Sequence, residues 1–259
     1  DRKRVLAAED SKRSDRDHIT LWALNDKGLQ NLFKLTSISW IRGFYSKPRI
    51  DMKLLAEYAE GVAASTGCVS GVVAKPLRDG NPIEAERRLQ RLGEIFPSRF
   101  YVEIMPHVPP GTEGVTDVLV RWAKQYSLPL IATQDAHYPH VEDALAQKVF
   151  LCIKTQSKLS APKHVFDTPE YWLRSRDEML QAFARWLPQL DASTINSALD
   201  ATLALTDACS ATLQPTKPGV YLAAPPLLAS VKSYEDWLEK ACYAGWRKKF
   251  STSVESCVE

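Results

Sequence analysis

Short apolar runs alternate with helical patterns through most of this chain, and this alternation limits the possible folds more than any single motif does. The apolar runs cover residues 18–24, 61–66, 100–105 and 128–133. Helical patterns follow them over residues 29–40, 81–92, 115–126 and 142–154. Because neighbouring parallel strands need a crossover between them, four successive strand–helix units predict an α/β fold built on a parallel sheet. A closed barrel and an open sheet both agree with this order.

Two of the predicted helices carry clear local signals. Asn81, Pro82 and Glu84 have the order of an N-cap, a proline at the first helical position and a capping-box glutamate. Apolar side chains then recur at helical spacing without a break from Val115 to Tyr126. These two segments are the ones in which the helix is most strongly encoded.

The pattern changes in the last third of the chain. Helical spacing occurs over residues 177–186 and 193–206, after which prolines interrupt the chain at positions 215, 218, 225 and 226. A last amphipathic pattern covers residues 233–250. We therefore expect one domain over residues 1–212, a proline-broken linker over 213–232 and a further segment over 233–259.

The composition is typical of a soluble globular protein. Of the 259 residues, 45% are hydrophobic and 25% are charged, which is enough for a substantial core. The chain has no run of about 18 apolar residues, so we expect no membrane-spanning helix. Five cysteines without a pairing pattern, and no signal peptide before them, predict a reduced, cytoplasmic protein. The net charge of +2 is too small to indicate nucleic-acid binding by itself, and a first residue other than Met predicts a fragment.

Metal-ligand residue types gather where the predicted strands end. Asp135 and His137 follow the run at 128–133, and alternation along an extended backbone would place both side chains on one side. Cys68 follows the run at 61–66 in a similar position. His18 stands at the head of its run instead, which makes it the least well placed candidate. Thiolate, imidazole and carboxylate groups together are suited to zinc, so we expect a metal site at this edge of the sheet.

Several segments between His18 and about residue 185 resemble a known family, and they occur in the family's order. They are HITLWALNDKGLQNL from His18, GFYSKPRID from Gly43, EGVAASTGCVSG from Glu60, FYVEI from Phe100, LPLIATQDAHY from Leu128, LCIKT from Leu151, and residues 166–179. Together they are similar to the N-terminal PHP (polymerase and histidinol phosphatase) domain of bacterial and phage DNA polymerase III alpha subunits. Gln134 stands where that family commonly has Asn.

The resemblance implies a distorted (β/α)7 barrel, incomplete at its N-terminus in this chain and followed by helical segments. In the family, a cleft at the carboxyl ends of the strands holds three metal ions, zinc or manganese, on nine ligands. His18, Cys68, Asp135 and His137 match the last four of these ligands. The other five would lie in upstream sequence that this chain does not contain. The family has no catalytic group at this cleft apart from the metal ligands.

The resemblance also implies a parent enzyme, a DNA-directed DNA polymerase whose magnesium-dependent palm lies outside this chain. Residues 233–259 would begin its palm or thumb region. The PHP segment would be a metal-dependent phosphoesterase of the 3′–5′ exonuclease type, inactive as this fragment alone. The implied partners are DNA, a sliding clamp and a proofreading exonuclease subunit. Two alternatives remain: a non-catalytic scaffold that braces the polymerase and docks that exonuclease, and a free-standing phosphatase.

Other polar residues have weaker signals. Lys47 and Arg49 lie in a segment that is near the mouth of the family's cleft, so they are candidates for holding a phosphate backbone. His107, His140 and His164 are expected on the surface or in loops, with His140 close enough to His137 in sequence to need a check. The remaining cysteines are expected to be structural or incidental.

Overall fold

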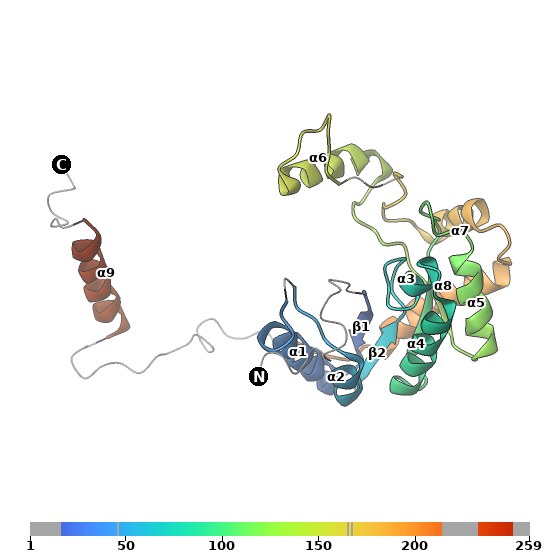
Figure 1. Ribbon diagram of the computed structural model, residues 1–259, viewed down its shortest axis with the longest axis horizontal. Helices are drawn as coiled ribbons and strands as arrows, with labels where there is room; N and C mark the ends of the chain where they lie inside the picture. Colours follow the sequence, from blue (N-terminus) through green and yellow to red (C-terminus); the bar gives the residue numbers. More distant parts are fainter. Residues whose placement is uncertain (1–16, 46, 165, 167, 214–232, 251–259) are drawn as a thin grey trace. The chain divides into compact units, whose positions relative to one another are not determined.

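The computed structural model describes residues 17–45, 47–164, 166, 168–213 and 233–250. The chain divides into two compact units, Asp1–Thr212 and Leu213–Glu259. In the described part of the second unit, one helix, α9 (Tyr234–Phe250), is present. All other elements belong to the first unit (Figure 1).

A four-stranded sheet with the order β1-β2-β3-β4 forms the centre of the first unit. The strands are β1 (Thr20–Ala23), β2 (Val62–Ser65), β3 (Phe100–Ile104) and β4 (Leu130–Ala132). The strands β2, β3 and β4 pair in parallel, as predicted, whereas β1 runs antiparallel to β2 with Thr20 opposite Ser65. The prediction of an all-parallel sheet is therefore wrong for the first strand.

The connection between β1 and β2 explains this reversal. It passes through α1 (Asp26–Ile41) and α2 (Met52–Glu57) and returns to the end of the sheet that it left, where the Leu24 amide donates to the Gly61 carbonyl over 2.8 Å. A Cβ on Gly28 would lie 1.8 Å from the Gly61 carbonyl oxygen, and Gly61 itself has a φ of 70°. This close approach of α1 to the start of β2 requires glycine at both positions, 28 and 61. Hydrophobic periodicity identifies elements but not the direction in which they pair.

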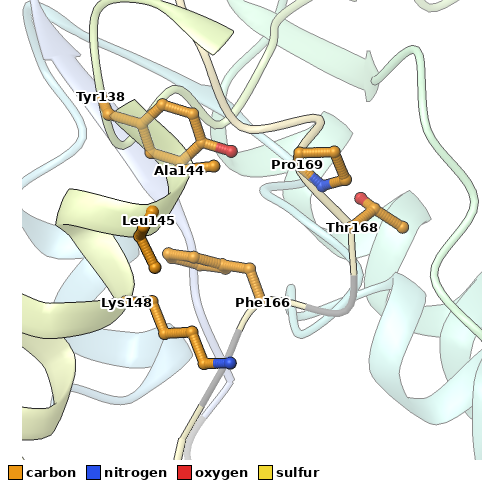
Figure 2. A pocket seen from close by; sticks show the side chains of 7 residues that line it. All are labelled: Tyr138, Ala144, Leu145, Lys148, Phe166, Thr168 and Pro169. Atoms are coloured by element: carbon orange, nitrogen blue, oxygen red, sulfur yellow. The ribbon is translucent and has the colours of Figure 1, made fainter. Parts of the chain in front are cut away.

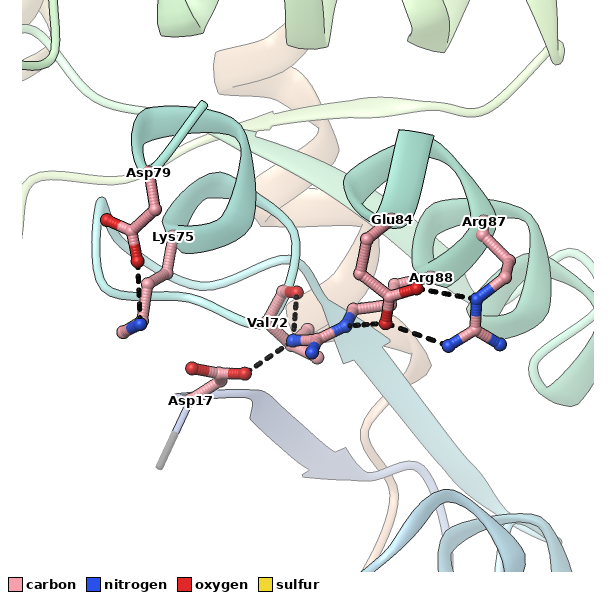
Figure 3. A network of polar contacts seen from close by, with 7 residues as sticks. All are labelled: Asp17, Val72, Lys75, Asp79, Glu84, Arg87 and Arg88. Carbon is pink, nitrogen blue, oxygen red and sulfur yellow. Dashed lines mark hydrogen bonds and ion pairs between the residues drawn. The ribbon is translucent and has the colours of Figure 1, made fainter. Parts of the chain in front are cut away.

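Five of the remaining helices agree closely with the predicted patterns. They are α4 (Pro82–Ile95), α5 (Val115–Gln125), α6 (Ala144–Thr155), α7 (Arg176–Trp186) and α8 (Ala192–Ala208). The helix α3 (Ala74–Arg78) and a short 3₁₀ turn at Val141–Asp143 were not predicted. The two shortest helices, α2 and α3, span less than two turns, so they leave no readable period in the sequence. Asn81 caps α4 by accepting from the Glu84 amide over 3.1 Å, as predicted. The Glu84 side chain, however, binds arginines (Figure 3) rather than closing a capping box.

Helices cover both faces of the sheet. Val62, Phe100 and Val102 turn toward one face and pack with Leu89 and Leu92 of α4 and with Leu119 and Trp122 of α5. On the other face, Ala63 and Ile131 pack with Leu205 of α8. The described residues of the first unit thus form an open α/β sheet with helices on both faces. A closed (β/α)7 barrel is not part of the structure described.

In the described residues, no helix has both the length and the apolar character that crossing a membrane requires.

Candidate functional site

The candidate ligands lie at one edge of the sheet. Cys68 and Asp135 follow the carboxyl ends of β2 and β4, which point the same way because the strands between them are parallel. The antiparallel β1 begins at that edge, so His18 lies beside the loop after β2. The His18 amide donates to the Ser70 carbonyl over 3.1 Å, and the Val72 amide donates to the His18 carbonyl over 2.8 Å. The argument that His18 is poorly placed is therefore wrong, since it assumed that the first strand is parallel.

His18 and Cys68 form the first donor pair, with the Nδ1 atom 3.8 Å from the Sγ atom. The pKa of the Cys68 thiol is raised, first by burial and then by the negative charges of Asp135 and Glu103, against a lowering effect of the Ser70 backbone. The thiol is therefore protonated at neutral pH when no cation is near it. A bound divalent ion would reverse this preference, because a coordinating thiol is deprotonated.

Asp135 and His137 form the second donor pair, with the Oδ1 atom 3.3 Å from the Nε2 atom. The strand β4 ends at Ala132, and Asp135 has a left-handed backbone with a φ of 51°. Strand alternation therefore does not bring the two side chains together, contrary to the prediction. They meet across a turn instead, which is fixed where the His137 amide donates to the Tyr171 carbonyl over 2.7 Å. Asp is one of the few residues that tolerate this conformation.

The donor set suits a divalent metal ion, but in two separate pairs. A thiolate, two imidazoles and a carboxylate are the ligands that zinc takes in proteins. Among the described residues, no group of three or more His, Cys, Asp or Glu side chains is close enough to hold one ion. Each pair can supply two donors, and the charge of Asp135 reaches Cys68 electrostatically.

A buried carboxylate that we did not predict lies at the same edge. Glu103, near the end of β3, is 7% exposed and accepts hydrogen bonds from the hydroxyl groups of Ser65 and Thr133, the latter over 2.5 Å. Its amide donates to the Thr66 hydroxyl over 2.9 Å. One carboxylate thus ties the ends of β2, β3 and β4 together. The sequence contained a signal for this buried carboxylate, because Glu103 is the charged residue in the otherwise apolar run FYVEI.

His107 lies in the loop after β3, in agreement with the expectation of a surface or loop position, but it is buried. It is 6% exposed, and its ring centroid lies 5.1 Å from that of Tyr171 in an edge-on arrangement. Burial lowers the pKa of His107, and within the described residues its Nδ1 atom has no hydrogen-bond partner. His140 and His164 are exposed, as predicted. The His140 amide donates to the Asp143 carboxylate over 3.2 Å, so His140 caps the turn before α6.

Gln134 connects the loop after β4 to a later segment. Its Nε2 atom donates to the Arg174 carbonyl over 3.0 Å, and its Oε1 atom accepts from the Arg174 amide over 2.6 Å. The Arg174 side chain is buried and forms an ion pair with Glu170. Gln134 therefore holds the turn that carries Asp135 and His137.

Arg88 of α4 fastens the segment that carries His18 (Figure 3). Its Nη1 atom donates to the Asp17 carboxylate over 2.5 Å and to the Val72 carbonyl over 3.3 Å, while its Nε atom donates to Glu84 over 2.7 Å. Asp17 precedes His18, and Val72 follows the Cys68 loop. One guanidinium group therefore holds both chain segments of the first donor pair against the same helix.

Lys47 and Arg49 lie in the connection between α1 and α2. The Arg49 guanidinium lies 5.1 Å from the centroid of the Tyr45 ring. Its Nε and Nη2 atoms are buried and have no hydrogen-bond partner in the described part of the chain. No hydrogen bond or ion pair of the described residues joins Lys47 or Arg49 to the two donor pairs.

Comparison with known proteins shows two levels of similarity. Residues 5–107 match the family described as the PHP domain. Relatives named DNA polymerase III subunit alpha match over longer stretches. The protein of Thermus aquaticus is 37% identical over 163 residues, which is 62% of this chain and 13% of its own length.

Two further relatives with the same name extend this match. The protein of Treponema pallidum is 33% identical over 183 residues, 70% of this chain and 16% of its own length. That of Aquifex aeolicus is 29% identical over 252 residues, 96% of this chain and 21% of its own length. This chain therefore spans about a fifth or less of the length of these relatives.

Proposed function

This chain contains a PHP-domain sequence and is homologous to part of the bacterial DNA polymerase III alpha subunits, and on that premise we propose that it is the PHP segment of such a subunit. The parent would be a DNA-directed DNA polymerase whose magnesium-dependent palm lies outside this chain. In it, the sheet would be completed to a (β/α)7 barrel. The segment would supply a metal-dependent phosphoesterase site of the 3′–5′ exonuclease type, and residues 233–259 would lead into the polymerase region.

The observation that carries this proposal is the meeting of His18 and Cys68. The two residues are 50 positions apart, and only the antiparallel pairing of β1 brings their donor atoms to 3.8 Å. The Asp135–His137 pair lies at the same edge of the sheet. Zinc or manganese held there would supply Lewis acidity and a metal-activated water for attack on a phosphodiester.

The chain's own residues would bind and orient the DNA and the donors. Glu103 would hold the three strand ends in register, since it accepts from hydroxyl groups on both neighbouring strands. Arg49 would bring a guanidinium charge to the DNA backbone, since guanidinium groups bind phosphate oxygens through charged hydrogen bonds. Lys47 would add a second positive charge to the same stretch of the DNA backbone.

A scaffold is the second candidate, and one observation favours it. The described donors form two pairs rather than one group of three or more, so an ion held here has few ligands from this chain. The segment would then brace the polymerase and dock a proofreading exonuclease subunit, with a sliding clamp as a further partner of the parent. A free-standing phosphatase is disfavoured, because the similarity to the alpha subunits continues well beyond residue 107.

Nuclease activity of the parent subunit separates the two candidates. A 5′-labelled single-stranded DNA is incubated with the parent subunit and manganese or zinc, and shortened products are resolved on a denaturing gel. Asp135→Ala should abolish shortening from the 3′ end, while His164→Ala, at an exposed histidine outside the site, should leave it unchanged. Shortening that persists in Asp135→Ala would exclude a catalytic role for this site and leave the scaffold.

A further inference from the structure

A cavity of about 260 Å³ lies beside the second donor pair (Figure 2). Its wall comes from the start of α6, from the segment around Pro169, and from Tyr138 in the turn after His137. The lining residues are Tyr138, Ala144, Leu145, Lys148, Phe166, Thr168 and Pro169. This volume is slightly below the range of about 300–1,000 Å³ that is usual for small-molecule pockets, so the cavity admits at most one small ligand.

The cavity shares a wall with a candidate metal ligand. The ring centroid of Phe166 lies 4.6 Å from that of His137 and 4.4 Å from that of Tyr171. The His137 ring in turn is 5.7 Å from Tyr171 and 3.3 Å from the Asp135 carboxylate. A ligand that contacts Phe166 in this cavity therefore lies next to the Asp135–His137 pair.

The lining combines an aromatic surface with one positive charge. Leu145, Phe166 and Pro169 offer apolar contact, and Leu145 is 63% exposed although it is a large hydrophobic residue. Figure 2 shows the Lys148 side chain running alongside Phe166. Within the described ranges the Lys148 ammonium group has no ion pair or hydrogen bond, so its charge is available to a ligand. The ligand that fits is flat, partly apolar and anionic.

We propose that this cavity binds the terminal nucleotide of a DNA strand, with the base against Phe166 and a phosphate at Lys148. The inference rests on the proposed phosphoesterase function and identifies where that site would take the strand end. Stacking on an aromatic ring tolerates every base, since every base has a π-face, which suits a site that acts on DNA of any sequence. Because the Phe166 ring lies 4.6 Å from the His137 ring, a base that stacks on Phe166 would lie beside the metal-ligand pair.

Nucleotide binding to the 259-residue chain tests the proposal, with deoxyadenosine 5′-monophosphate as the probe and calorimetry as the readout. Phe166→Ala should weaken binding by about tenfold or more, and Phe166→Trp should restore it, since stacking on an aromatic side chain contributes about 1–3 kcal/mol per base. Lys148→Ala should weaken binding by several-fold and reduce its dependence on salt. Deoxyribose 5-phosphate, which lacks the base, should bind at least tenfold more weakly than the nucleotide.

Matched controls come from α6, the helix that carries Lys148. Phe150→Ala and Lys154→Ala remove a ring and a charge of the same kinds outside the cavity, and they should leave the affinity unchanged. Equal losses in Phe166→Ala and Phe150→Ala, or equal affinity for the nucleotide and the sugar phosphate, would overturn the proposal. Asp135→Ala separates nucleotide binding in the cavity from metal binding at the donor pairs. Nucleotide binding that survives in this variant while metal binding is lost supports the proposal. Metal binding that survives while nucleotide binding is lost refutes it.

Discussion

Replacing Arg88 should destabilise the fold far more than replacing its neighbour Arg87, although both bind Glu84. The Arg88 side chain is 27% exposed and also binds Asp17, whose side chain is 19% exposed. Within the part of the chain that the structure describes, the second carboxylate oxygen of Asp17 is buried and has no hydrogen-bond partner. Arg88→Ala would leave that carboxylate without its cation and the Val72 carbonyl without a donor. Loss of such partly buried, charged hydrogen bonds predicts a fall of about 1–3 kcal/mol in the free energy of unfolding.

Arg87 provides the matched control. Its side chain is 68% exposed and its ion pair is a surface contact within one helix. Arg87→Ala should therefore lower the free energy of unfolding by only about 0.5 kcal/mol or less. Arg88→Lys should fall between the two, because lysine keeps the charge but cannot bind Asp17 and Glu84 through one planar fork.

Urea unfolding followed by circular dichroism measures these differences, provided that the slope with denaturant is the same in all variants. The expected order of stability is wild type, Arg87→Ala, Arg88→Lys and Arg88→Ala. Equal stability of Arg87→Ala and Arg88→Ala would refute the reasoning, because it would mean that the contacts with Asp17 and Val72 contribute nothing.

Three other variants and one control, Glu142→Ala, test polar groups of the fold, each by urea unfolding. Hydrogen bonds from Arg87 and then Arg88 lower the pKa of Glu84 from 4.5 to about 2. The stability that Glu84 contributes is therefore present above pH 4.5 and lost as the pH falls toward 2. Glu84→Gln should make the free energy of unfolding less dependent on pH in this range. Glu103→Ala should lower the free energy of unfolding by about 2–4 kcal/mol, because it leaves the hydroxyl groups of Ser65 and Thr133 without their acceptor. The control Glu142→Ala removes an exposed carboxylate and should lower it by less than about 0.5 kcal/mol. Burial lowers the pKa of His107 below 6.5, so folding opposes protonation of this residue. The free energy of unfolding should therefore fall as the pH drops below 6.5, and His107→Phe should remove this fall. A steeper fall in His107→Phe than in the wild type would contradict the reasoning.

The elements of the fold were predictable because each long helix has a clear period and each strand is an apolar run. Val115 to Tyr126 became a helix within one residue of its predicted end. The direction of β1 was not predictable, because no local pattern shows that the connection through α1 and α2 returns to the end of the sheet that it left.

The site was predictable in its residue types but not in its geometry. Cys68 and the Asp135–His137 pair follow strands, as the sequence indicated. The contact of 3.3 Å between Asp135 and His137 depends on the left-handed backbone of Asp135, which periodicity cannot reveal. His18 was undervalued because its strand was assumed to be parallel. The burial of the loop residue His107 was not predictable, because it depends on later residues such as Tyr171, which pack on it only in the folded chain.

Cobalt binding to this chain tests the central claim, that His18 and Cys68 are brought together as metal donors. A cobalt titration of the folded chain should give a near-ultraviolet sulfur-to-metal absorption band that disappears in Cys68→Ser and is weakened at least tenfold in apparent affinity in His18→Ala. Cys209→Ser, at an exposed free cysteine, should leave the band unchanged. A band that persists in Cys68→Ser, or that is lost equally in Cys209→Ser, would contradict the account.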